Sequence, residues 1–128
     1  MPDGTHLSAW VTVLAALFYF WTLINVGRMR QKHGVKAPAM TGPLEFECAL
    51  RVQMNTLEAM PVFLPLLWLA TLYFGGSVPA AFGLLWVVGR FLYMQGYMKA
   101  PEKREIGFGV QALALVGLLG LTAWGLVS

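Results

Sequence analysis

The stretch that decides the fold is residues 59–89, AMPVFLPLLWLATLYFGGSVPAAFGLLWVVG, which contains no charged side chain. A helix needs about 20 apolar residues to cross a hydrocarbon layer of about 30 Å, so this run is too long for a single span. Its centre holds Gly75, Gly76, Ser77 and Pro79, and residues of these types end one helix and begin the next. The sequence therefore predicts two membrane-spanning helices joined by a tight hairpin.

Two further charge-free runs, Leu7–Gly27 and Ile106–Ser128, lie on either side of this pair. The N-terminal flank of the first run holds Asp3 and His6 and no lysine or arginine, so we expect a retained span rather than a cleavable signal peptide. The sequence thus predicts an all-α fold, an integral membrane four-helix bundle that forms one domain over residues 1–128. The expected helices are residues 6–31, 44–74, 78–99 and 105–127.

The composition supports a membrane protein. Hydrophobic residues make up 58% of the chain and charged residues only 12%, whereas soluble domains are about 25% charged. The net charge of +3 does not favour nucleic-acid binding, because the basic residues form no single long run. The positive-inside rule instead predicts that the first and third loops are cytoplasmic and both termini lie on the opposite side. The basic residues on which this rests are Arg28, Arg30, Lys32, Lys36, Lys99, Lys103 and Arg104.

Polar side chains interrupt the second and third expected helices. They recur every three or four residues, as Glu47, Arg51, Asn55 and Glu58 on the second helix and as Arg90, Tyr93 and Tyr97 on the third. That spacing places each set on one helical face. Counted from the hairpin at 1.5 Å per residue, Glu58 lies about 25 Å along its helix and Tyr93 about 24 Å along the next. Because the two faces match in depth, we expect a hydrophilic pocket near the cytoplasmic surface.

The pocket's chemistry suits a small zwitterion. Arginine forks bind carboxylates through two parallel hydrogen bonds, and Glu58 suits an ammonium group. The amides of Gln53 and Asn55 and the phenols bond amide and hydroxyl groups. The complement is a peptide-like metabolite with an amine and more than one carboxylate. We expect no metal site, because His6 and His33 fall on opposite sides of the membrane.

A purely structural role for the same residues stays open at this point. Arg51 paired with Glu58 or Glu47, and Arg90 paired with Glu58, would be buried ion pairs that hold helices together. Taken alone, Tyr93 and Tyr97 would be aromatic residues of the membrane–water boundary.

Three segments resemble a known family. They are residues 41–47 (TGPLEFE), 51–58 (RVQMNTLE, followed by Pro61) and 90–97 (RFLYMQGY, followed by Arg104). They are similar to the membrane-associated proteins in eicosanoid and glutathione metabolism, the MAPEG superfamily, in its branch of microsomal glutathione transferases and leukotriene C4 synthase. The resemblance covers nearly the whole chain. It implies a homotrimer of four-helix subunits, with glutathione as cosubstrate bound between neighbouring subunits near the cytoplasmic face.

The resemblance also assigns residues to that site. The implied glutathione contacts are Arg51, Asn55, Glu58, Tyr93 and Tyr97 from one subunit, and Arg30 and Gln53 from its neighbour. Arg104 is the implied catalytic residue, which faces the thiol, and Arg90 is a structural partner within the polar network. A free thiol has a pKa of about 8.5, and a guanidinium beside it favours the nucleophilic thiolate.

The activity that the resemblance implies is conjugation of glutathione to hydrophobic electrophiles that arrive from the bilayer. Ala59 and Gln31 stand where leukotriene C4 synthase has tyrosine and arginine, and Glu105 stands where the prostaglandin E synthase branch has serine. These departures disfavour a specialised eicosanoid role. They favour a broad glutathione transferase, with glutathione peroxidase activity on lipid hydroperoxides as a further expectation.

Two alternatives to an enzyme remain at this stage. One is a non-enzymatic lipid-binding scaffold of the five-lipoxygenase-activating type, although such a site does not need so many polar groups. The other is a small multidrug transporter, whose first span carries a membrane-embedded glutamate. Leu7–Gly27 has none.

Overall fold

The structure is a computed structural model, and it describes residues 5–75 and 77–128. Four long helices follow one another along the chain, with a short 3-10 helix before the last. They are α1 (Thr5–His33), α2 (Leu44–Phe74), α3 (Ser77–Lys99), η1 (Pro101–Arg104) and α4 (Glu105–Val127). The expected all-α, four-helix architecture is confirmed. The predicted ends of α2 and α4 match, whereas α1 is slightly longer at both ends and α3 begins one residue earlier than expected.

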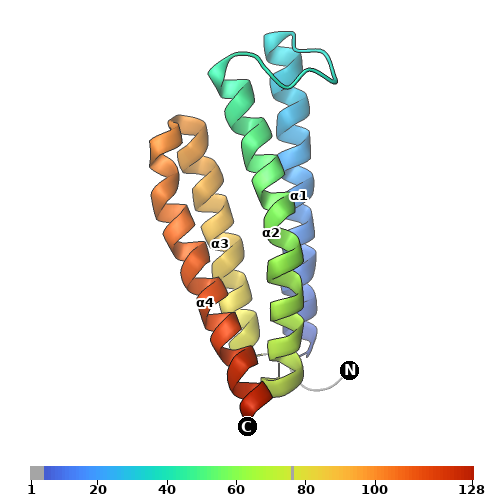
Figure 1. The fold of residues 1–128 in the computed structure, drawn as a ribbon. Helices are drawn as coiled ribbons and strands as arrows, with labels where there is room; N and C mark the ends of the chain where they lie inside the picture. Colours follow the sequence, from blue (N-terminus) through green and yellow to red (C-terminus); the bar gives the residue numbers. More distant parts are fainter. Residues whose placement is uncertain (1–4, 76) are drawn as a thin grey trace.

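The helices form two antiparallel hairpins, α1 with α2 and α3 with α4 (Figure 1). The start of α1 and the end of α4 lie at one end of the bundle, and the α1–α2 loop and η1 lie at the other. Between α2 and α3 the expected tight turn is present, with Gly76 outside the described residues. Gly75 adopts a φ of 76°, a left-handed conformation that favours glycine. Its N–H donates to the carbonyl of Thr71 at 2.9 Å and so ends α2.

The centre of the bundle is a stack of two aromatic rings. The rings of Phe63 and Trp86 are parallel within 6°, and their centroids are 3.9 Å apart. Both side chains are fully buried, and the core around them takes Ala15 from α1, Leu67 from α2 and Leu118 from α4. Lipid tails are as apolar as these side chains, so close packing rather than escape from water holds such a core together.

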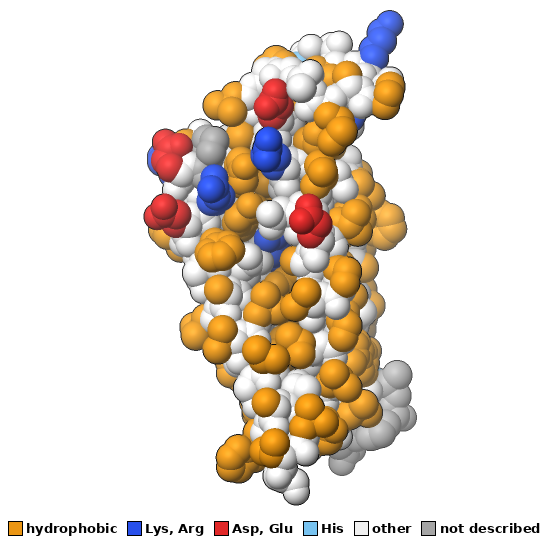
Figure 2. Space-filling model, in the orientation of Figure 1, with side chains coloured by type: hydrophobic (Ala, Val, Ile, Leu, Met, Phe, Trp, Pro, Cys, Tyr) orange, Lys and Arg blue, Asp and Glu red, His pale blue; other side chains and the backbone are white. Residues whose placement is uncertain are grey.

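The outer surface is apolar. All four helices are long and apolar enough to cross a membrane. Large side chains point outward, among them Leu72 and Ile106, which are 78% and 74% exposed. Figure 2 shows that charged side chains gather at the end with the α1–α2 loop and η1, while hydrophobic side chains cover the rest of the visible face. This distribution suits a protein whose body lies in lipid and whose loop end lies among headgroups.

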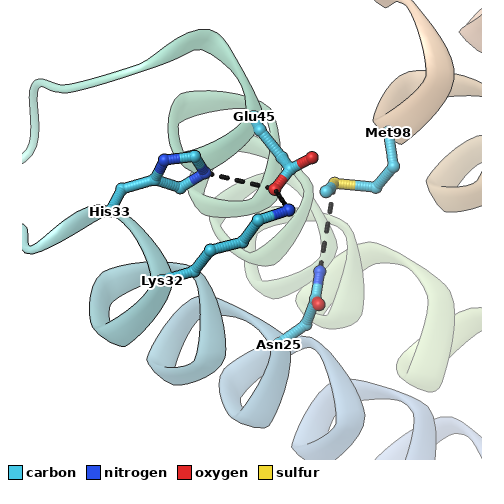
Figure 3. Close-up of polar contacts among 5 residues, drawn as sticks. All are labelled: Asn25, Lys32, His33, Glu45 and Met98. Atoms are coloured by element: carbon cyan, nitrogen blue, oxygen red, sulfur yellow. Dashed lines mark hydrogen bonds and ion pairs between the residues drawn. The ribbon is translucent and has the colours of Figure 1, made fainter.

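The α1–α2 loop is fixed at both ends by polar contacts. Lys32 and His33, at the end of α1, both contact Oε1 of Glu45 at the start of α2, at 2.7 Å and 3.1 Å (Figure 3). Within the loop, Arg30 donates to the carbonyl of Ala39 at 2.8 Å. These contacts set the path of residues 34–43, which pass over the α1–α2 pair.

A polar contact also joins the two hairpins near this end. The amide of Asn25 on α1 donates to the sulfur of Met98 on α3, with a nitrogen–sulfur distance of 3.9 Å (Figure 3). Cys48 packs nearby among Phe18, Val52 and Tyr93, as a small buried side chain. Contacts between α1, α2 and α3 therefore join the two hairpins near the α1–α2 loop.

Candidate functional site

A cleft of about 340 Å³ opens between α2 and α3 at the charged end of the bundle. Three segments contribute its lining. The residues are Glu47, Leu50, Arg51, Met54, Asn55 and Glu58 from α2, Tyr93 and Tyr97 from α3, and Met40 and Thr41 from the α1–α2 loop. The polar faces that the sequence places at matching depths thus meet in one hollow.

Five of the eight predicted site residues lie in this lining: Arg51, Asn55, Glu58, Tyr93 and Tyr97. The α2 side chains are exposed to the cleft, whereas the two tyrosines are only 4% and 8% exposed. The tyrosine rings pack edge to face with centroids 5.5 Å apart. These buried rings form a wall of the cleft.

The alternative of buried ion pairs also finds no support in the described part of the chain. Within residues 5–75 and 77–128, neither Arg51 nor Glu58 makes an ion pair, and the ion pairs present involve Glu45. A guanidinium and a carboxylate at this depth are costly unless something else satisfies them. The cleft therefore offers the Arg51 guanidinium and the Glu58 carboxylate to a bound molecule, while Glu47, which also lines it, accepts from the N–H of Gly42.

Arg90 lies behind the cleft and joins three helices. Its side chain is fully buried, and its Nη1 donates to Oε1 of Gln111 at 3.0 Å and to Oδ1 of Asn55 at 3.3 Å. Its Nη2 donates to Oγ1 of Thr56 at 2.6 Å. The guanidinium carbon also lies 4.4 Å from the centroid of the Tyr93 ring. Thr56 was not among the residues predicted from the sequence, although a hydroxyl beside a polar face in an apolar helix indicates an interhelical hydrogen bond.

Arg30 and Gln53 lie outside the cleft of their own chain. Gln53 donates to the phenol oxygen of Tyr19 on α1 at 3.0 Å. Two positions from Arg51 on a helix, it faces another direction. Arg30 is engaged with the α1–α2 loop, and its guanidinium lies 5.0 Å from the ring of Phe46. A site contribution from these residues to a neighbouring subunit stays a prediction.

Arg104 ends η1 beside the cleft rather than in its lining. Its guanidinium carbon lies 5.3 Å from the ring centroid of Tyr97, which does line the cleft. Gly96 makes this arrangement possible, because a Cβ there would overlap the carbonyl of Lys103 in η1. The close approach brings η1 against α3 and holds Arg104 over the tyrosine wall.

The described part of the chain contains no cluster of side chains suited to binding a metal ion. Within residues 5–75 and 77–128, no three His, Cys, Asp or Glu side chains lie close enough to hold a metal ion.

Comparison with known proteins identifies the family of the chain. Residues 8–124 match the MAPEG family. The chain is 41% identical to microsomal glutathione S-transferase 2 of Mus musculus, over 100% of this chain and 87% of that protein. It is 38% identical to leukotriene C4 synthase of Cavia porcellus, over 100% of this chain and 85% of that protein. An uncharacterized protein of Synechocystis sp. is 46% identical over 92% of this chain and 89% of its own length. This chain, with four helices long and apolar enough to span a membrane, is therefore a multi-pass integral membrane protein that belongs to the MAPEG family.

Proposed function

We propose that the protein is a membrane-bound glutathione transferase that joins the sulfur of glutathione to hydrophobic electrophiles. One observation carries the proposal: the α2–α3 cleft holds Arg51 and Glu58 without ion-pair partners among the described residues. Glutathione has two carboxylates, one ammonium, two amides and a thiol, so its charges complement that pair. The relatives named as a glutathione transferase and as leukotriene C4 synthase support the same activity.

Binding follows from the chemistry of the lining. Arg51 receives a carboxylate through its two-pronged fork, and Glu58 receives the ammonium. Asn55 and the phenols of Tyr93 and Tyr97 bond the remaining peptide groups. The cleft opens beside the apolar outer surface of the bundle, so the electrophile reaches it from the bilayer.

We further propose a homotrimer in which Arg30 and Gln53 of one subunit complete the cleft of the next. Both side chains lie away from their own chain's cleft, where Arg30 contacts the α1–α2 loop and Gln53 contacts Tyr19. The basic loop end then faces the cytoplasm, where glutathione is dissolved, and both termini lie on the opposite side.

The chemical step needs an ionised sulfur and no protein nucleophile. Arg104 stabilises the thiolate, and each unit by which it lowers the thiol pKa is worth about 1.4 kcal/mol. The thiolate then forms a carbon–sulfur bond with the electrophile, and the leaving group departs with the bonding electrons. Holding both reactants in one cleft converts an encounter in solution into a step between bound neighbours.

Turnover measured on the purified protein tests this function. The assay uses detergent-solubilised protein with glutathione and a simple aryl halide, and a second assay replaces the halide with a lipid hydroperoxide. We expect conjugation with the first and glutathione-dependent reduction with the second. Saturable glutathione binding without turnover of either substrate would favour the scaffold alternative. Proton-coupled flux of a drug in proteoliposomes would favour the transporter.

Arg51→Met is expected to weaken glutathione binding about 30-fold. The substitution leaves the bound carboxylate without its charged partner, a loss of about 2 kcal/mol. Calorimetric titration of the purified protein with glutathione measures it. Arg28→Met is the matched control, because Arg28 is exposed outside the cleft, with its guanidinium 5.9 Å from the Trp21 ring. Equal dissociation constants for the two variants would remove Arg51 from the site.

A further inference from the structure

Arg90 carries a positive charge that no described carboxylate balances through an ion pair. Its three acceptors, Asn55, Thr56 and Gln111, are neutral. Its Nε is buried without a hydrogen-bond partner. A guanidinium stays protonated inside proteins, and a buried charge without a counter-charge is costly. The described protein alone leaves this charge uncompensated.

The unbalanced charge stands one side chain away from the cleft. Asn55 and Tyr93 contact Arg90 on one side and line the cleft on the other. Because the guanidinium is fully buried, little water screens its charge in that direction. A negative group placed in the cleft near Asn55 would therefore be attracted by Arg90 without touching it.

The hydrogen bonds also fix which way Asn55 points. A guanidinium only donates, so Asn55 must turn its oxygen towards Arg90. Its amide nitrogen then remains to donate to a molecule in the cleft. Thr56 donates its own proton to the carbonyl of Val52 at 2.7 Å, so it too meets Arg90 as an acceptor. Of these two acceptors only Asn55 lines the cleft, so Asn55 is the residue that presents an N–H donor to it.

We propose that Arg90 is the electrostatic anchor for an anionic group of the bound molecule, acting through Asn55, and that Gln111 on α4 holds it in place. The inference rests on the proposed function, in which that anionic group is a carboxylate or the thiolate of glutathione. Arg90 is a positioning residue, because it lies behind the wall and does not reach the ligand. An anionic group in the cleft brings negative charge towards Arg90, which makes no ion pair among the described residues.

Gln111→Glu separates this role from a purely structural one. Gln111 is only 6% exposed and sits behind Arg90, away from the cleft. Glutamate has nearly the same size and still accepts the hydrogen bond, but it gives Arg90 a counter-ion from the far side. We expect glutathione to bind about tenfold more weakly while the thermal midpoint is unchanged or higher. A structural role alone predicts the same midpoint change with unchanged affinity, a result that would overturn the proposal.

Gln111→Met is the matched control, because methionine has a similar volume and carries no charge. It removes the acceptor but leaves the positive charge uncompensated, so we expect a smaller loss of affinity than in Gln111→Glu. Equal losses would show that the position of Arg90 matters and its charge does not, which also overturns the proposal. If Gln111→Glu does not fold, Asn55→Asp places the counter-ion on the cleft side. We expect it to bind glutathione at least tenfold more weakly, and wild-type affinity would contradict the proposal.

Two analogues identify which anion Arg90 holds. S-methylglutathione has no thiolate, and the diethyl ester of glutathione has no charged carboxylate. A Gln111→Glu effect that persists with S-methylglutathione and vanishes with the ester assigns a carboxylate, and the reverse assigns the thiolate. An effect on neither overturns the inference. Absence of glutathione binding by the wild-type protein would overturn the proposed function as well, whereas binding with no Gln111→Glu effect overturns this inference alone.

Discussion

Gly107→Ala is expected to destabilise the protein by about 3 kcal/mol and to remove most of its glutathione-dependent activity. A Cβ at Gly107 on α4 would overlap the backbone nitrogen and Cα of Tyr93 on α3, and it would lie 2.7 Å from the carbonyl oxygen of Gly89. These obstacles are backbone atoms, so the two helices themselves have to move apart. Because Tyr93 lines the cleft, that movement displaces one wall of the site.

Gly109→Ala is the control for this prediction. Gly109 lies two residues further along α4, and a Cβ there would meet nothing within 4 Å. Alanine is also the better helix former, so this change should leave the thermal midpoint equal or higher. Thermal unfolding in detergent, followed by circular dichroism, compares the two variants. A midpoint for Gly107→Ala close to that of Gly109→Ala would show that α3 and α4 are further apart than described.

Arg104→Ala is expected to lower turnover about a hundredfold, which corresponds to about 2.7 kcal/mol of transition-state stabilisation. The guanidinium stacks on Tyr97 beside the cleft, where it can hold the sulfur of glutathione as an anion. Arg51 and Glu58 still bind the charged ends of the peptide, so its dissociation constant should change less than threefold. The ultraviolet absorbance of the bound thiolate should fall in parallel with turnover.

A conservative substitution and a neighbouring control variant test this prediction further. Arg104→Lys retains a positive charge and should restore part of the thiolate absorbance. Lys103→Ala removes an exposed neighbouring cation in η1 and should leave turnover near that of the wild type. Arg104→Ala with full turnover would exclude Arg104 from catalysis.

The four-helix bundle and the part of the site between α2 and α3 could be predicted from the sequence. The reason is that a bilayer allows a spanning segment very few backbone conformations. A charge-free run of fixed minimum length allows little except a helix, and Gly75 marks the turn that divides the longest run. Helical spacing then places Arg51, Asn55 and Glu58 on one face. Depth along two antiparallel helices brings that face opposite Tyr93.

The remaining features depend on approaches between segments that no local pattern encodes. The place of Arg104 depends on η1, which the sequence did not predict, and on how closely Gly96 lets it approach α3. The sequence analysis left open an Arg90–Glu58 pair, but Arg90 instead bonds neutral side chains from α2 and α4. Which partner a buried arginine takes depends on the rotation of each helix, which periodicity fixes only approximately.

The wall formed by the α1–α2 loop was also missed. Met40 and Thr41 reach the cleft because Arg30 holds the carbonyl of Ala39 and Glu47 accepts from the N–H of Gly42 at 3.0 Å. Both contacts join a helix side chain to the backbone of an irregular loop. Helical periodicity in the sequence therefore does not predict them.

The position of the cleft on the seam between two hairpins has a thermodynamic consequence. A molecule that fills the cleft contacts α2 from one hairpin and α3 from the other, and it therefore links the two hairpins reversibly. By mass action, a ligand that binds only the assembled protein at a hundredfold excess over its dissociation constant adds about 2.7 kcal/mol to the free energy of unfolding. If glutathione is the ligand, as proposed, its concentration would therefore set the thermal stability of the protein as well as the rate of turnover.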